Sequence, residues 1–187
     1  MIFWHTARAK FDNNYSGSDM PWEKYIEWSR LTQLTELISL DGMLNELLVK
    51  PDHSNEDDWN YIITDGDYET GFYKSRDYVL SKIDTNSKFN LIMAVKEPEA
   101  ECSQMKIDDY DFIGYELLDE DYGISALSNC GGFDETFLPS ELNQFGLISN
   151  RDNAFDIRKR LLENNPDEHH ADCNVLAVWR HKTLGND

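Results

Sequence analysis

Hydrophobic positions follow two different spacings along the chain, and each spacing predicts a different kind of element. Residues 20–39 and 150–164 place apolar side chains three or four positions apart, which is typical of one buried face of a helix. Residues 88–95, 111–118 and 175–181 are short and rich in β-branched or aromatic side chains, which predicts strands. The chain therefore combines helices and strands in one sequence.

Local signals indicate where several elements begin. Pro21 predicts the start of the first long helix, because the first helical turn leaves the N–H that proline lacks unpaired in any case. Ser75 is placed to cap a short helix over residues 76–83. Ser149, with Asp152 three positions later, resembles a capping box that opens the second long helix.

Other segments give weaker signals. Residues 43–49 fit a helix or a strand equally well. In residues 111–118, alternation predicts that Ile113, Tyr115 and Leu117 share one side of a strand. The remaining predictions are an edge strand at residues 1–7, strands at 59–63 and 124–128, and a brief helical turn at 139–140.

These elements predict the fold class. The strands between residues 89 and 128 follow one another through loops that are too short for crossover helices, so they are expected to be antiparallel. We therefore predict a single acidic α+β domain over residues 1–187. Its mostly antiparallel mixed sheet has about five strands and packs against two main helices, at about 20–39 and 150–164.

Composition excludes several classes of protein. Hydrophobic residues make up 40% of the 187 positions and aromatic residues 12%, which is too much apolar bulk for a disordered acidic chain. The longest apolar runs, Leu91–Val95 and Val175–Trp179, are far shorter than the roughly 20 residues that span a bilayer. The first ten residues do not have the order of a secretory signal. We expect no membrane association and a cytoplasmic location.

Cysteine usage supports the same compartment. The chain has an odd number of cysteines, at the widely spaced positions Cys102, Cys130 and Cys173. No two of them form a Cys-x-x-Cys pair. This pattern indicates free thiols in a reducing environment, and neither a disulfide framework nor a structural zinc module.

The charge is strongly negative and unevenly distributed. The formal net charge is −19, and residues 51–122 hold 19 of the 36 carboxylates but only six of the 17 basic residues. We do not expect the chain to bind nucleic acid, because such binding requires basic patches. The acidity favours a basic protein partner or a cation, unless its only role is solubility.

Candidate partner-binding residues come from the acidic segment and from one tryptophan. Trp28 lies away from the apolar direction of its predicted helix, so it is a candidate exposed anchor, whereas Trp4, Trp22, Trp59 and Trp179 are expected in the core. The acidic candidates form two clusters, namely Asp108, Asp109 and Asp111, and Asp119, Glu120 and Asp121.

Two clusters could carry chemistry instead. The first cluster consists of residue types that zinc accepts as ligands, namely Glu168, His169, His170 and Cys173. The alternative is that these residues only form a polar loop before the last strand. Cys130 precedes two glycines and could act as a nucleophile, with His169 or His170 as base and Asp172 as orienting carboxylate; a tight turn beside a packed thiol is the alternative. Phosphate-binding glycine motifs are missing from the sequence, and no cofactor is predicted.

The sequence thus leads to one main functional expectation. In size, acidity and aromatic content the chain is similar in physical character to bacterial inhibitor and immunity-type proteins. We expect a non-enzymatic interaction protein whose acidic surface at residues 51–122 binds a basic protein. The alternative is a small hydrolase or metal-dependent enzyme that uses Cys130 and the cluster at residues 168–173. Oligomeric state is not predicted.

Overall fold

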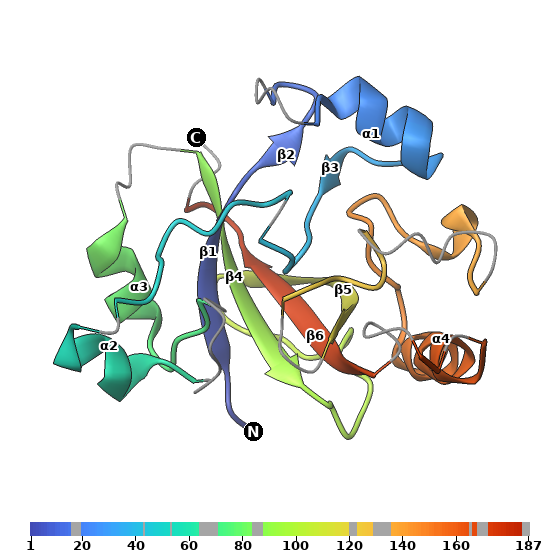
Figure 1. Cartoon of the computed structure of the whole chain (residues 1–187). Coiled ribbons are helices and arrows are strands. Elements are labelled where there is room, and N and C mark those ends of the chain that lie inside the picture. The colour runs from blue at the N-terminus through green and yellow to red at the C-terminus, as the bar shows by residue number, and fades with distance from the viewer. Residues whose placement is uncertain are drawn as a thin grey trace.

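The chain folds around a four-stranded antiparallel sheet (Figure 1). The computed structural model describes residues 1–15, 20–42, 44–52, 54–63, 71–83, 88–119, 123–128, 136–164, 166–167 and 172–184. The strand order is β1-β4-β6-β5, and each neighbouring pair is antiparallel. The strands are β1 (Trp4–Ala9), β4 (Phe89–Lys96), β5 (Tyr110–Asp119) and β6 (Cys173–His181).

The remaining elements surround this sheet. A second, two-stranded sheet pairs β2 (Phe11–Asp12) with β3 (Glu36–Leu37). Figure 1 shows α2 and α3 together on the β1 side of the sheet and α4 near the lower end of β6. The helices are α1 (Trp22–Ser29), α2 (Glu56–Tyr61), α3 (Arg76–Lys82) and α4 (Arg151–Asn164), with a 3-10 turn η1 at Pro139–Glu141. The predicted α+β class is confirmed.

Both faces of the four-stranded sheet are buried, which explains the nearly continuous apolar runs of its central strands. Along β4, Leu91 and Met93 belong to one hydrophobic cluster, and Ile92 and Ala94 belong to a second. The helix α4 covers part of the first face through Ala154, Ile157 and Leu161. The second face is covered by irregular segments that contribute Ile38, Leu40, Phe72 and Leu147.

The outer edges of the sheet are also occupied. Loop residues hydrogen-bond to the backbone of both edge strands, so the unpaired groups that invite edge-to-edge association are satisfied there. At β1 these bonds join His5 to Tyr73 and Leu48 to Ala7, and at β5 they join Tyr115 to Ile148 and Ala126 to Leu117.

The predicted helix at 20–39 is correct only in its first half. The helix α1 ends at Ser29, where Arg30 adopts a left-handed conformation (φ 58°) and its N–H bonds to the carbonyl of Ile26. Beyond it, the chain is irregular and then forms β3. Leu31, Leu34 and Leu37 are buried in this non-helical path, so their helix-like spacing reflects burial on several sides.

Two predicted strands, and the segment at 43–49 that fits a helix or a strand, also differ from the structure. Residues 59–61 form the end of the helix α2, and Ile62 makes only an isolated bridge to Tyr73. Residues 43–49, apart from position 43, which lies outside the described residues, form neither a helix nor a strand, and Leu47 makes only an isolated bridge to Arg8. Residues 124–128 likewise give only the bridge between Ser125 and Leu118.

Other predictions are confirmed. The helices α3 and α4 occur where expected, and the Ser75 hydroxyl accepts the Tyr78 N–H. At α4, however, it is the Asn150 side chain that accepts from the N–H of Asn153. The turn η1 lies at the predicted Pro139. None of the helices in the described ranges is both long and apolar enough to cross a bilayer.

A bulge in β5 changes one predicted face. The register shifts between Phe112 and Gly114, so Ile113 packs in the second cluster while Tyr115 and Leu117 pack in the first. Gly114 has φ +143°, a conformation that favours glycine. The bulge therefore separates Ile113 from the side that simple alternation assigns to it.

Replacing Gly114 tests how strongly the fold depends on this bulge. An added Cβ would lie 2.7 Å from Leu147 Cβ and 2.9 Å from the Ile148 carbonyl oxygen. Gly114→Ala should therefore lower the free energy of unfolding by at least about 2 kcal/mol in urea denaturation. Gly42→Ala is the control, because its nearest neighbour, Arg8 Nη1, is 3.7 Å away. Equal stability of the two variants would show that the bulge is not required.

Candidate protein-interaction surface

The first predicted acidic cluster lies at the turn that leads into β5. Asp108, Asp109 and Asp111 are all exposed. The carbonyl of Asp109 accepts the N–H of Lys182 at 2.9 Å, and the Asp111 carboxylate lies 3.8 Å from the Lys182 ammonium. This cluster is accessible to a partner, and one of its charges is partly offset by a neighbouring lysine.

The second cluster does not join the first. Asp119 ends β5, and since a strand advances about 3.3 Å per residue, Asp119 lies roughly 30 Å from Asp109. The Asp119 side chain is buried and accepts the N–H of Gly123 at 2.7 Å, so it shapes a turn. Glu120 and Asp121 lie outside the described residues. The prediction that Asp119 contributes to an exposed acidic surface is therefore wrong.

The tryptophans divide differently from expectation. Trp28 is 48% exposed on α1, as its position on the helix predicts, and Trp4, Trp22 and Trp179 are buried. Trp59 was expected in the core but is 51% exposed on α2. The short helix turns its indole outward, whereas the predicted strand would have packed it.

The candidate enzyme and metal residues are only partly described. Cys130, Glu168, His169 and His170 lie outside the described residues. Asp172 is exposed, whereas Cys173 is buried at the start of β6, and its burial raises the pKa of the thiol to about 12. A thiol in that environment is protonated at neutral pH and is a poor nucleophile or metal ligand. Within the described ranges, no three His, Cys, Asp or Glu side chains converge to hold a metal ion.

The helix α2 presents a surface that the sequence patterns missed. Trp59 and Tyr61 are 51% and 39% exposed, and Glu56 and Asp57 in the same helix are exposed as well. The signal for this helix was available: Asn55 caps it by accepting the N–H of Asp57 at 3.0 Å, ahead of acidic residues in the first turn. The aromatic run that follows favoured a strand instead.

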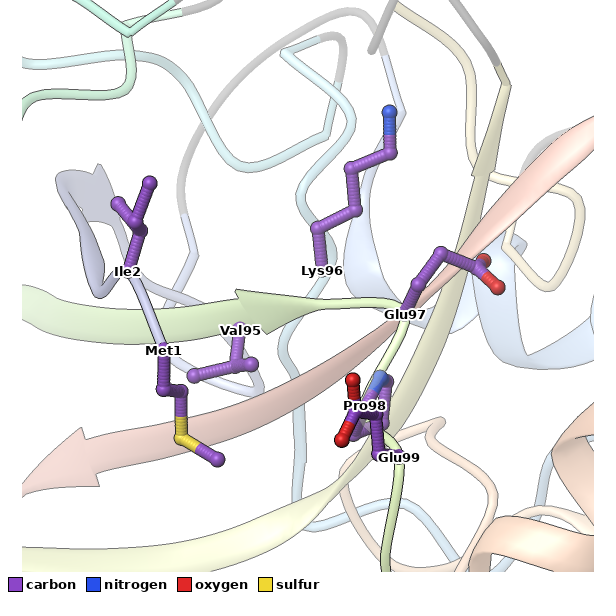
Figure 2. Close-up of a pocket in the computed structure, with 7 residues that line it drawn as sticks. All are labelled: Met1, Ile2, Val95, Lys96, Glu97, Pro98 and Glu99. Atoms are coloured by element: carbon purple, nitrogen blue, oxygen red, sulfur yellow. The ribbon is translucent and has the colours of Figure 1, made fainter.

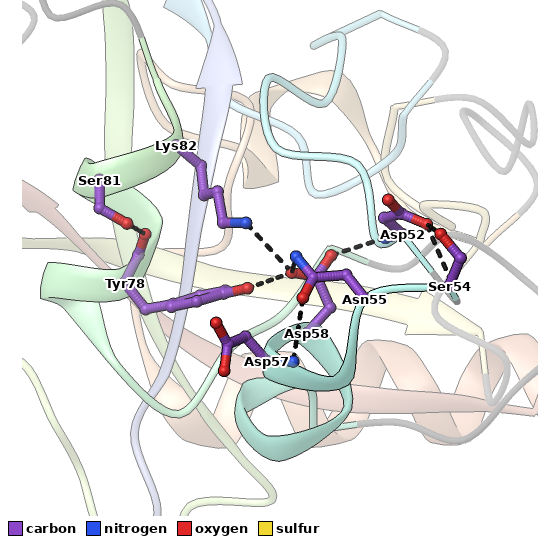
Figure 3. Close-up of polar contacts among 8 residues, drawn as sticks. All are labelled: Asp52, Ser54, Asn55, Asp57, Asp58, Tyr78, Ser81 and Lys82. Carbon is purple, nitrogen blue, oxygen red and sulfur yellow. Dashed lines mark hydrogen bonds and ion pairs between the residues drawn. The ribbon is translucent and has the colours of Figure 1, made fainter.

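The position of α2 is fixed by a buried carboxylate (Figure 3). Asp58 accepts hydrogen bonds from the N–H of Asp52, the hydroxyl of Tyr78 and the amide of Asn55, and its Oδ1 lies 3.5 Å from Lys82 Nζ. Burial alone would raise the pKa of Asp58, but these donors and the lysine hold it below its ordinary value. The carboxylate therefore joins α2 to α3 as an ionised group.

Aromatic stacking strengthens the same contact between the two helices. The rings of Tyr61 and Tyr78 are stacked with centroids 4.4 Å apart and an interplanar angle of 21°. The ammonium of Lys82 lies over the Tyr78 ring at 5.0 Å from its centroid. The α2 surface is thus supported from below by polar and aromatic contacts to α3.

Two of the hollows in the described part of the chain lie beside ionisable side chains. The one in Figure 2 has a volume of about 310 Å³ and is lined by Met1, Ile2 and residues 95–99. Its Glu97 is already bound to Arg158 at 2.6 Å and to the N–H of Val175 at 2.7 Å. The other, about 460 Å³, lies beside α4 and includes Leu162 and Cys173. Asp172 also lines this second hollow.

A buried ionisable group lies inside the fold, where segments from three regions meet. Glu116 is 1% exposed and accepts hydrogen bonds from the N–H of Leu40 at 3.2 Å, the N–H of Leu117 at 3.0 Å and the hydroxyl of Ser125 at 2.8 Å. Burial, with a smaller contribution from Asp41, raises the pKa of Glu116 to about 7. A raised carboxyl pKa can mark an active site. Here the group is fully enclosed and connects loops to β5.

Comparison of the chain with protein-family models, with curated proteins and with solved structures gave no match.

The pKa of Glu116 predicts a pH dependence of stability. A carboxyl whose folded pKa is raised from 4.5 to about 7 stabilises the fold fully below pH 4.5 and loses that contribution as the pH rises through 7. The unfolding free energy of the wild type, minus that of Glu116→Gln, should fall by about 3 kcal/mol between pH 4.5 and pH 8. Urea denaturation of both proteins at both pH values measures this difference. An equal difference at pH 4.5 and pH 8 would contradict the raised pKa of Glu116.

Proposed function

We propose that the chain is a non-enzymatic acidic interaction protein of the inhibitor or immunity type, which binds a basic protein in the cytoplasm. The contact surface lies within residues 51–122. The observation that carries this proposal is the exposure of Trp59 and Tyr61 beside Glu56 and Asp57 on α2. Acidic residues at a surface are usually only solvated, but exposed aromatic side chains among them are characteristic of binding anchors.

The two kinds of side chain have complementary roles in this proposal. Carboxylates attract a cationic partner over about 8 Å at physiological salt and so increase the association rate. Aromatic side chains that become desolvated in the complex slow its dissociation. Since α2 carries both kinds of group on one short, well-anchored element, little ordering is needed on binding.

Further exposed groups extend the proposed surface. Asp108, Asp109 and Asp111 add negative potential near the start of β5, and Trp28 offers an aromatic anchor on α1. These groups lie on different elements, so a partner would contact them as separate patches. The bonded edges of the sheet favour a partner that docks on helices and turns over one that adds a strand.

Charge reversal tests the proposal. A cationic protein captured from native lysate at low salt would be identified, purified and studied by stopped-flow association. The association rate constant should fall steeply as the salt concentration rises, and Glu56→Lys/Asp57→Lys should lower it roughly tenfold at low salt.

The matched control carries the same charge change on α4. Asp152 and Glu163 are exposed there, with side-chain exposures of 96% and 60%, so Asp152→Lys/Glu163→Lys alters the net charge equally. An equal effect of both pairs would contradict the location of the surface. Failure to retain any basic protein, or salt-independent association, would contradict the function itself.

A further inference from the structure

We propose that α2 recognises arginine side chains of the partner, with a guanidinium seated against each of two carboxylate–aromatic pairs. The first pair is Glu56 with Trp59, and the second is Asp57 with Tyr61. This inference rests on the proposed function and adds the chemical group that the surface selects.

The helical geometry of α2 creates the two pairs. Successive residues turn by about 100°, so Glu56 and Trp59 are neighbours at i, i+3, and Asp57 and Tyr61 are neighbours at i, i+4. Asp58 points toward the interior, which leaves the carboxylates of the first turn on the outward face. Trp59 and Tyr61 lie on opposite flanks of that face, about 200° apart around the axis. Each flank therefore joins one carboxylate to one ring.

Such a pair suits a guanidinium better than an ammonium group. The guanidinium is planar and weakly hydrated, so it can stack on a ring while its N–H groups bind a carboxylate at the ring edge. An ammonium group is a compact, strongly hydrated charge that gains less from stacking. Trp offers the best ring face for a cation, which makes the Glu56–Trp59 pair the more selective one.

The same chemistry already operates inside the protein. Arg151 and Arg158 both place their guanidinium carbons over the ring of Phe155, at 4.3 and 4.7 Å from its centroid. Lys82 is held between the Tyr78 ring and the Asp58 carboxylate, directly behind α2. Arg158 is also paired with Glu97, and Arg180 lies over the Phe145 ring while it is paired with Glu36, so rings and carboxylates bind cations together at several places in this fold.

Rigidity of the support favours selectivity. Asp58 fixes α2 to α3 through the Tyr78 hydroxyl and the Lys82 ion pair, and Tyr61 is stacked on Tyr78. Asp58 also accepts from Asp52 and Asn55, which immediately precede α2. A side chain held in this way cannot easily rearrange to suit a differently shaped cation. The difference between arginine and lysine should therefore appear as a difference in affinity.

Two peptides of equal charge test the inference. Fluorescently labelled octa-arginine and octa-lysine would be titrated with the full chain at low salt, with anisotropy as the readout. Both should bind, and octa-arginine should bind roughly fivefold more tightly, since a planar guanidinium can stack on a ring and bind a carboxylate at the same time. Trp59→Ala should reduce this preference to about twofold or less, and Glu56→Gln should weaken both complexes.

Controls separate the possible failures. Leu162→Ala removes a large apolar side chain that is 51% exposed on α4 and should retain the preference, and urea denaturation of each variant shows whether it is folded. Equal binding of both peptides by the wild type would overturn the arginine inference and leave the basic-partner proposal standing. A preference that survives Trp59→Ala and Glu56→Gln would overturn its placement on α2. Binding of neither peptide would contradict the proposed function as well.

Discussion

Burial of the four-stranded sheet on both faces is the constraint on which the rest of this structure depends. A sheet covered on both sides needs apolar residues at nearly every position, and β4 and β6 have them. The few polar groups on it must then find partners inside the fold. Asn90 and Arg180 show this: they donate hydrogen bonds to Glu36 of β3 at 2.6 Å and 2.8 Å, which ties the small second sheet to the large one.

The same constraint decides where function can reside. Both broad faces of the sheet are covered, and loop residues occupy its outer edges, so its strands present little surface to a partner. The exposed side chains to which the proposed partner would bind lie on elements at the periphery, such as α1, α2 and the turn before β5. The helix α2 is the most suitable of these, because a buried carboxylate anchors it while its aromatic side chains remain outside. A rigid support beneath an exposed anchor is what a protein-binding surface requires.

The sequence was most informative where one physical requirement dominated. The apolar run of β6 reports burial on both faces of the sheet, the periodicity of α4 reports burial of one helix face, and both elements lie where they were predicted. The segment after Ser29 was wrongly predicted to continue the helix, because leucines that are buried on several sides can have the same spacing as the buried face of a helix. In α2, the β-forming tendency of Trp59 and Tyr61 competed with an N-cap and an acidic first turn, and the helix that formed lets Asp58 accept the N–H of Asp52.

The candidate site was harder to predict for a related reason. From the sequence alone, every carboxylate of residues 51–122 is taken as surface charge. In the structure, the described carboxylates of this segment divide into a buried group and an exposed group. Asp58, Glu116 and Asp119 are buried and accept hydrogen bonds from backbone or hydroxyl groups, so they build the fold and contribute little to the external field. The field that a partner would meet arises from the exposed carboxylates, and among the described ones in residues 51–122 those on α2 share their helix with exposed aromatic side chains. Local pairing of charge with aromatic surface, more than the total charge, therefore supports the placement of the proposed binding surface on α2.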